Sequence, residues 1–208
     1  FGYVDSNFSA SYAYKTLPLI SVGRIPASNG ADAMVVNKKI LAYMNADIAP
    51  DAYSRALAFS DDGDSNQHLK QSLEVADPLR QETPITVYQP HNLIFVRKND
   101  LNEMAMSRIS EALRTGVGFF SFTGHGNAQN FTREGIYGVD VLNNTSYNVQ
   151  PYAHLSTCDS YVLDRNIRNI GEQMFCKADG GAIAVSGACR SVYMVQNQIL
   201  NTAIAKVY

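Results

Sequence analysis

A pair of short apolar runs, each ending in a reactive side chain, constrains the fold of this chain more than any other feature of its sequence. Residues 117–122 (Val-Gly-Phe-Phe-Ser-Phe) lead into the sequence Thr-Gly-His-Gly around His125, and residues 152–155 (Tyr-Ala-His-Leu) lead to Cys158. Short apolar runs bounded by turn residues are typical of strands buried on both faces. In an open α/β sheet, reactive groups gather at the carboxyl ends of parallel strands. The sequence therefore predicts that His125 and Cys158 meet at one edge of a sheet.

Apolar runs and amphipathic segments alternate along the rest of the chain. Strands are predicted at 17–22, 55–60, 84–88 and 181–185, and helices at 28–45, 67–79, 100–115, 170–177 and 195–208. Residues 93–96 fit either a short strand or a buried loop, and 127–150 is expected to be irregular. The first helix is expected to bury a stripe of Ala33, Val36, Ile40 and Tyr43. This alternation predicts an α/β fold whose mostly parallel sheet has helices on both faces.

Composition limits the classes of protein to which the chain can belong. Its 208 residues are 46% apolar and 17% charged, which fits one globular domain with a substantial core. The net charge of −2, without a cluster of Lys or Arg, does not favour nucleic acid as a partner. No apolar stretch approaches the length of about 18 residues that a membrane span needs.

The three cysteines, Cys158, Cys176 and Cys189, cannot all pair with one another, so at least one thiol is expected to be free. The sequence has no C-x-x-C motif and no closely spaced pair of histidines, and we therefore expect no structural zinc site. It also lacks the G-x-S-x-G, Walker and G-x-G-x-x-G patterns. No metal or cofactor is predicted.

A thiol and an imidazole at adjacent strand ends suit nucleophilic catalysis. A cysteine attacks as its thiolate, and a nearby imidazole can take the thiol proton and later protonate the leaving group. Taken alone, Cys158 would be interpreted as a buried cysteine and His125 as a turn histidine, but together they favour a catalytic pair. The backbone amides of Gly126 and Cys158 are the natural candidates for an oxyanion hole.

A second histidine on the cysteine strand is a rival base. Because strands rise about 3.3–3.4 Å per residue, His154 and Cys158 should lie about 13–14 Å apart, too far for a hydrogen bond. We therefore interpret His154 as a partly buried strand histidine. His91 follows a proline in an expected loop and has no obvious partner.

Three carboxylates follow another predicted strand. Asp61, Asp62 and Asp64 come directly after residues 55–60 and could reach the same edge of the sheet. One of them could orient the imidazole or bind a basic substrate side chain. The alternative is a solvated acidic turn without a functional role.

Several segments together resemble the gingipain-type cysteine peptidases, peptidase family C25. They are 22–26 (Val-Gly-Arg-Ile-Pro), the acidic loop from Asp61, the Thr-Gly-His-Gly sequence around His125, Thr157-Cys158, and 180–184 (Gly-Gly-Ala-Ile-Ala). The resemblance implies a caspase-like three-layer sandwich formed by residues 1–208 as a single domain. Family domains carry further segments at both ends, so the chain is expected to be trimmed at both.

The resemblance also implies roles for individual residues. His125 and Cys158 fall on the catalytic dyad of the family, Asp62 best matches the acidic partner of the histidine, and Asp64 matches the acidic residue of the pocket for basic P1 side chains. The opposite wall of that pocket is expected from residues 186–193, in particular Ser186, Gly187, Val192 and Tyr193.

The function implied is that of a secreted or bacterial cell-surface cysteine endopeptidase, which cleaves proteins or peptides through a thioester acyl-enzyme. Residues 157–159 and 190–197 resemble the sortase-like branch of type IX secretion, which transfers exported cargo. Other segments of its own precursor are further expected partners. The alternative is a caspase-like binding or scaffolding module of a larger precursor, with little or no activity.

Overall fold

The computed structural model describes residues 22–45, 53–62, 64–79, 85–88 and 98–208, of which 85–88 and 98–102 are described by their backbone only. The described part is built around a five-stranded parallel sheet with the strand order β2-β1-β3-β6-β7. The strands are β1 (Ala56–Ser60), β2 (Ile85–Tyr88), β3 (Phe119–Thr123), β6 (Tyr152–Ser156) and β7 (Ala184–Gly187). The strand predicted at 17–22 falls almost entirely outside the described residues, and the segment 93–96 falls wholly outside them.

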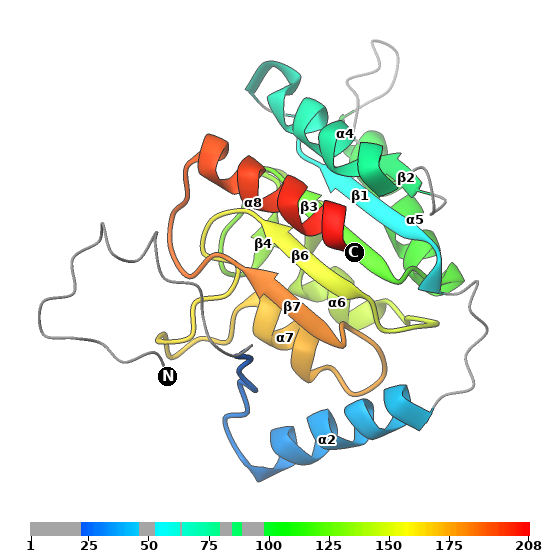
Figure 1. Ribbon diagram of the computed structural model, residues 1–208, viewed down its shortest axis with the longest axis vertical. Helices are drawn as coiled ribbons and strands as arrows, with labels where there is room; N and C mark the ends of the chain where they lie inside the picture. The colour runs from blue at the N-terminus through cyan, green and yellow to red at the C-terminus, as the bar shows by residue number, and fades with distance from the viewer. Residues whose placement is uncertain (1–21, 46–52, 63, 80–84, 89–97) are drawn as a thin grey trace, which may run out of the picture.

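Helices cover both faces of the sheet (Figure 1). The helix α4 (Gln67–Leu79) contacts β1, β2, β3 and α8 (Met194–Val207), and both helices lie on one face. The helices α5 (Lys98–Thr115), α6 (Val139–Asn144) and α7 (Ile170–Cys176) lie on the other. The helix α2 (Gly30–Asn45) packs on α7. This arrangement confirms the predicted three-layer α/β fold.

The two faces of β3 explain why its sequence is a continuous apolar run. Phe119 packs with Val75 of α4 and Ala205 of α8, whereas Phe120 and Phe122 join the cluster that includes Ile109 of α5. Because neighbouring side chains along a strand point to opposite faces, a strand covered on both faces must be apolar at almost every position.

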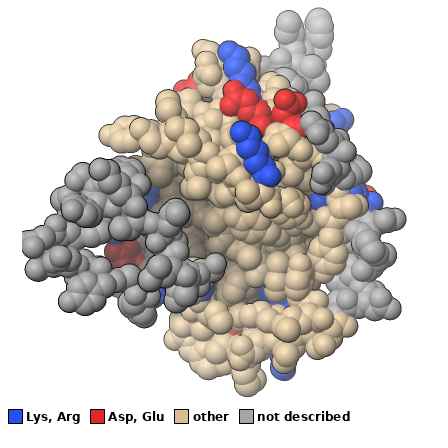
Figure 2. All heavy atoms as spheres, in the orientation of Figure 1, with Lys and Arg blue, Asp and Glu red and all other residues tan. Residues whose placement is uncertain are grey.

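The outward side of α8 is apolar as well. Val195 and Ile199 are 66% and 67% exposed. Figure 2 shows this face of the molecule, on which charged side chains gather over α4 and the end of α8, and most of the remaining visible surface is neither acidic nor basic. None of the helices described is long and apolar enough to cross a bilayer.

The segment 127–150, predicted to be irregular, contains regular structure. The strands β4 (Asn130–Phe131) and β5 (Tyr137–Gly138) form a small antiparallel hairpin, which is followed by α6. Phe131 stacks on Phe122 with ring centroids 4.5 Å apart. This contact fixes the hairpin to β3, the strand that leads to His125. The prediction failed here because strands of two residues are too short to show an alternating pattern.

Helix boundaries agree with the sequence except at α5. Asn29 caps α2, because its side chain accepts a hydrogen bond from the Asp32 amide at 2.9 Å. The helix α5 begins at Lys98, two residues before the predicted start at 100. Asn99 and Asp100 are both good caps in sequence, and the pattern alone does not say which of several polar residues begins the helix.

One residue on the buried side of α2 is a lysine. Val36 is buried as expected, but the other buried residue of this helix is Lys39, and Tyr43 is 38% exposed, so the predicted apolar stripe is only partly right. The Lys39 ammonium group donates to the carbonyl of Phe175 at 2.8 Å and to those of Met174 and Ala182 at 3.4 and 3.3 Å. It thereby satisfies carbonyl groups at the end of α7.

Lys39 should make stability depend on pH. Burial lowers the pKa of Lys39 to about 8, whereas an unfolded lysine has a pKa of about 10.4. Between these values the unfolded chain binds more protons, so this residue should raise the free energy of unfolding with pH, by up to about 1.4 kcal/mol per pH unit. In urea denaturation, the stability difference between wild type and Lys39→Met should be constant below pH 8 and grow above it. Lys38→Met, an exposed neighbour, should show no such growth. A difference that stays flat up to about pH 10 would contradict the assignment.

Candidate active site

The strands that carry the predicted thiol and imidazole are neighbours in the sheet. β3 and β6 pair in parallel with Thr123 opposite Ser156, and the pairing continues beyond the strands because the Gly124 amide donates to the Ser156 carbonyl at 3.3 Å. His125 and Cys158 each follow their strand by two residues. Since paired strands lie about 4.8 Å apart, the two loops leave the sheet side by side. The predicted adjacency of the two strand ends is confirmed.

The acidic loop leaves the sheet at the same edge. β1 lies on the other side of β3, with Ser60 opposite Thr123, and the Asp61 amide donates to the Thr123 carbonyl at 3.0 Å. The histidine loop is therefore flanked by the acidic loop on one side and the cysteine loop on the other.

The glycines on either side of His125 let the acidic loop and the cysteine loop pack closely against the histidine loop. A Cβ atom at position 124 would lie 2.4 Å from the Asp61 Cβ, and one at position 126 would lie 2.6 Å from the Thr157 Oγ1. Any larger residue would push the strand-end loops apart. The Gly-His-Gly pattern thus serves the packing of three loops around the imidazole.

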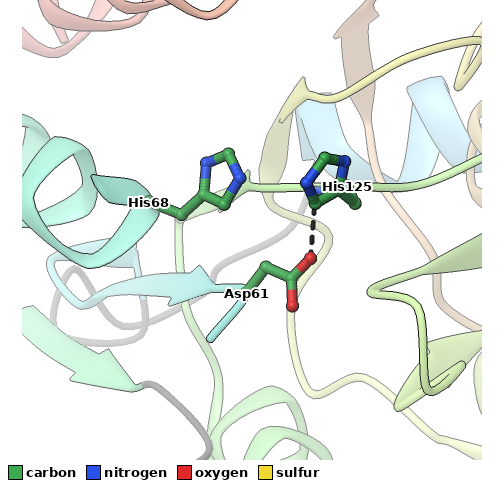
Figure 3. A group of neighbouring side chains, drawn as sticks. All are labelled: Asp61, His68 and His125. Atoms are coloured by element: carbon green, nitrogen blue, oxygen red, sulfur yellow. Dashed lines mark hydrogen bonds between the residues drawn. The ribbon is translucent and has the colours of Figure 1, made fainter. Parts of the chain in front are cut away.

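Two carboxylates contact His125 in different ways. The Asp61 carboxylate is buried and accepts a hydrogen bond from the His125 backbone amide at 3.1 Å (Figure 3). The Asp64 Oδ2 lies 2.8 Å from the His125 Nε2. Asp61 therefore positions the loop, and Asp64 orients the ring.

The Asp64 contact determines the roles of the two ring nitrogens. The hydrogen bond with His125, helped by the charges of His125 and His68, lowers the pKa of Asp64, so the carboxylate is ionised at neutral pH. An ionised carboxylate can only accept hydrogen bonds, and so the Nε2 of His125 must donate. In the neutral ring, Nδ1 is then left as the acceptor.

Asp62, predicted to partner His125, lies elsewhere. Its amide donates to the Asp61 carboxylate at 2.9 Å. Burial raises the pKa of Asp62, and the negative charges of Glu134 and Asp61 raise it further. Among the described contacts, the His125 ring hydrogen-bonds to Asp64 and not to Asp62. The ring contact that the sequence analysis expected of Asp62 is thus made by Asp64, the first of three successive residues with left-handed dihedral angles (φ of 53°, 55° and 64°).

A second histidine, which the sequence analysis did not single out, joins this group. His68 lies in the first turn of α4 and is 6% exposed. Its Nε2 lies 3.3 Å from the Asp64 Oδ2, and its ring meets that of His125 edge to face, with centroids 5.1 Å apart. The sequence did hold one signal for this contact, since His68 comes four residues after Asp64 at the start of a helix, a spacing that brings two side chains together.

Cys158 is half-buried in the turn that follows β6. Its sulfur lies 3.9 Å from the carbonyl oxygen of Val192, which precedes α8. The next residue, Tyr193, is 83% exposed. Of the residues predicted to line the substrate pocket, Val192 therefore contacts the thiol through its carbonyl, and the exposed Tyr193 follows it in the chain.

Ser186 and Gly187, the other two predicted pocket residues, are packed into the end of β7. The Ser186 hydroxyl hydrogen-bonds with the Tyr152 hydroxyl at 2.7 Å and with the His154 Nδ1 at 2.6 Å. A Cβ atom at Gly187 would lie 2.7 Å from the Ser160 Oγ. Ser186 therefore packs against β6, and Gly187 packs against the turn that follows Cys158.

His154 is a buried strand histidine, as the sequence indicates. It is 2% exposed, and burial lowers its pKa to about 4, so the ring is neutral at physiological pH. A ring fixed inside the sheet against Ser186 cannot act as a base at the strand ends.

The backbone around Gly126 leaves its amide pointing away from the hairpin. Gly126 pairs with Phe131 in an antiparallel bridge, whose flanking hydrogen bonds run from the Asn127 amide to the Asn130 carbonyl and from the Thr132 amide to the His125 carbonyl. In this pattern the paired residues themselves do not bond to each other, so the Gly126 amide points to the other side. Its predicted oxyanion role is compatible with this geometry.

All three cysteines are free thiols. The Cys176 sulfur lies 3.8 Å from the Pro26 carbonyl, and burial raises the pKa of this thiol. Cys189 is exposed. Cys158 and Cys189 each follow a strand of the sheet by two residues, but only the strand before Cys158, β6, pairs with the strand that leads to His125.

Comparison with known proteins identifies the family. The sequence matches the family model of peptidase family C25 over residues 1–208. The chain therefore belongs to peptidase family C25, and its class is that of the cysteine-type peptidases. No curated protein matches the sequence.

The fold is similar to those of solved gingipain structures. The crystal structure of the Arg-specific cysteine proteinase gingipain R (RgpB) has a TM-score of 0.67 at 14% identity, over 88% of this chain and 44% of that one. A complex of the pro- and mature domains of Porphyromonas gingivalis RgpB has a TM-score of 0.69 at 14% identity, over 87% and 43%. A third structure, described as a protease, has a TM-score of 0.63 at 16% identity, over 85% and 38%. The chain thus spans less than half the length of these solved chains.

Gly126→Ala should disturb the site through packing. The added Cβ would lie 2.6 Å from the Thr157 Oγ1 and 2.9 Å from the Asn130 carbonyl, so the histidine and cysteine loops would have to separate. We expect a loss of stability of about 1–3 kcal/mol and turnover reduced by up to about 100-fold. Gly30→Ala is the control, since nothing lies within 4 Å of its Cβ position. Wild-type stability and turnover in Gly126→Ala would show that the loops are not packed this tightly.

Proposed function

We propose that this chain is a cysteine endopeptidase in which Cys158 is the nucleophile and His125 the general base. The observation that supports this most is the pairing of β3 with β6, which brings both residues to one edge of the sheet two positions beyond paired residues. The Asp64 contact adds to it, because it leaves the second ring nitrogen of His125 as an acceptor. A ring fixed in this tautomer suits proton transfer from a thiol.

The proposed reaction uses these groups in sequence. The His125 Nδ1 takes the Cys158 proton, and the thiolate attacks the peptide carbonyl carbon. The amides of Gly126 and Cys158 donate to the oxyanion that forms. The imidazolium, stabilised by the Asp64 carboxylate, returns its proton to the leaving amine as the C–N bond breaks. Water, deprotonated by His125, then hydrolyses the thioester and releases the acid and the free thiol.

The substrates in this proposal are proteins or peptides, bound beside Val192 and Tyr193. Asp64 acts here on His125 and not as the binding group for a basic P1 side chain, because its carboxylate already contacts two imidazoles. Asp62, with a half-buried carboxylate beside Asp61, is then the less engaged acidic residue of this loop.

The setting we propose is secreted or at the bacterial cell surface, as the family resemblance implies. A sortase-like transfer would follow from the same thioester if an amine of an acceptor replaced water. Other segments of a precursor are further proposed partners, and the solved complex between the pro- and mature domains of RgpB supports this idea.

Cys158→Ala should abolish turnover while changing stability little, because a half-buried thiol in a turn contributes chemistry more than packing. Cys176→Ala and Cys189→Ala are the matched controls and should retain activity. A peptide-library assay, paired with labelling of the thiol by an acyloxymethyl ketone, makes the test. Turnover that survives in Cys158→Ala but not in Cys176→Ala would identify a different nucleophile, and an unreactive wild type would favour a binding module.

Asp64→Asn should separate an orienting role from a substrate-binding role. The asparagine oxygen can still accept from the His125 Nε2 but carries no charge to support the imidazolium. A hydrogen bond to a charged group is worth about 1.5–3 kcal/mol, so we expect turnover to fall by at most about 10- to 150-fold. The rate of Cys158 alkylation should shift to higher pH, since the thiolate–imidazolium pair loses the carboxylate that supports it. The P1 preference should not change.

Asp62→Asn is the control from the same loop and should leave the alkylation profile unchanged. Two results would reverse the assignment of Asp64 to His125: a changed P1 preference with normal turnover in Asp64→Asn, or a shifted alkylation profile in Asp62→Asn alone.

A further inference from the structure

The His68 side chain is buried beside the proposed active site without a hydrogen bond to its Nε2 atom. The residue is 6% exposed, and no hydrogen-bond partner of this nitrogen is present among the described residues. The Asp64 Oδ2 lies 3.3 Å away, in a contact that does not meet the geometry of a hydrogen bond. A buried polar atom without a partner is costly, so a ligand that fills this place would be bound favourably.

Several metal-binding atoms converge on the same point. The Asp64 Oδ2 lies 2.8 Å from the Nε2 of His125 and 3.3 Å from the Nε2 of His68. One ligand atom from each of Asp61, His68 and His125 also lies within 4.8 Å of the others, and Figure 3 shows the three side chains together. Ligands around a tetrahedral zinc ion, at bonds of about 2.0–2.1 Å, are about 3.3–3.4 Å apart. The contact between His68 and Asp64 has this spacing, whereas the shorter contact between His125 and Asp64 is a hydrogen bond that the ion would replace.

We propose that His68, His125 and Asp64 form a binding site for a zinc-like divalent cation, with the Asp61 carboxylate in reach as a fourth ligand. Two imidazoles favour zinc or cobalt over calcium or magnesium, which prefer oxygen ligands. The two carboxylates balance the double positive charge of the ion. The two histidines are distant in sequence, so a search for closely spaced ligands does not find this site.

A cation at this site would switch the peptidase off, a consequence that rests on the proposed function. A metal bound to the Nε2 of His125 occupies the lone pair of that nitrogen, and the single proton of the neutral ring must then be on Nδ1. That nitrogen can no longer accept the thiol proton, so the thiolate does not form. The metal also replaces the hydrogen bond between His125 and Asp64.

This mode of inhibition differs from the capture of a metal by the thiol. The proposed ligands lie on the side of His125 that faces Asp64 and α4, and Cys158 is not among them. Removing the thiol should therefore leave metal binding intact, whereas removing His68 should weaken it even though His68 does not touch the reacting atoms.

Calorimetric titration of Cys158→Ala with Zn²⁺ tests binding without any need for activity. We expect one Zn²⁺ per chain, and a tetrahedral absorption spectrum when Co²⁺ is used as the probe. Loss of an outer-shell partner of a metal ligand already weakens affinity about 10–100-fold, so adding His68→Gln should weaken it at least as much. Asp77→Asn, an exposed carboxylate on the same helix, is the control and should bind normally. Equal affinity with and without His68, or binding that requires Cys158, would overturn the site.

The inhibitory role is measured separately in the protein that retains Cys158. The Zn²⁺ concentration that halves turnover, normalised to the metal-free rate of each variant, should rise at least tenfold, the lower bound of the same range, in His68→Gln. His68→Asn, with a thermal unfolding curve for each variant, guards against misfolding as the cause. Zn²⁺ that binds through His68 without slowing turnover would overturn the switch but not the site. A chain that binds Zn²⁺ through His68 but shows no peptidase activity would instead contradict the proposed function.

Discussion

The parallel register of the three central strands is the constraint on which the site depends. Backbone hydrogen bonds between β1 and β3, and between β3 and β6, continue one residue past the strands, from the Asp61 amide to the Thr123 carbonyl and from the Gly124 amide to the Ser156 carbonyl. The loops that carry the carboxylates, the imidazole and the thiol therefore begin at fixed positions relative to one another. A slip of one residue in either pair would turn every side chain of the strand to the opposite face and take the site apart.

Within this frame several contacts together fix the position of the His125 imidazole. Asp61 binds the backbone of His125, Asp64 binds its ring, and the glycines at 124 and 126 let the neighbouring loops pack against it. Such convergence is what a catalytic base requires, because its reacting nitrogen must stay oriented through both proton transfers. It also places His68 where a cation bound at the proposed metal site would act directly on the His125 ring.

The sequence predicted the parts of this structure that rest on local patterns. The runs before His125 and Cys158 identified two central strands and their ends, because strands buried on both faces are apolar throughout. The burial of His154 followed from strand geometry alone. The helices α2, α4, α7 and α8 were likewise recognisable from amphipathic patterns and caps.

The remainder depended on contacts between segments distant in sequence. Nothing local distinguishes Asp62 from Asp64, since the difference lies in which carboxylate contacts His125 once the two loops are side by side. His68 reads as an ordinary polar residue at the start of a helix, and Lys39 as a solvated one, until α4 and α2 pack against their neighbours. The β4–β5 hairpin is recognisable only once Phe131 is seen to stack on Phe122.

The acidic loop after β1 has a further consequence for how such an enzyme can change. Asp61 is tied to the sheet, whereas Asp64 contacts the ring from three residues further along and is the first of three successive residues with positive φ. Left-handed backbone costs about 1–2 kcal/mol for each non-glycine residue, so this turn is held by its contacts, and the length of the loop between Asp61 and Asp64 sets where the carboxylate lies. An insertion or deletion here would move the carboxylate that orients the imidazole and leave the strands of the sheet in place. The loop is thus the natural place for divergence of rate, or for loop grafting in the laboratory.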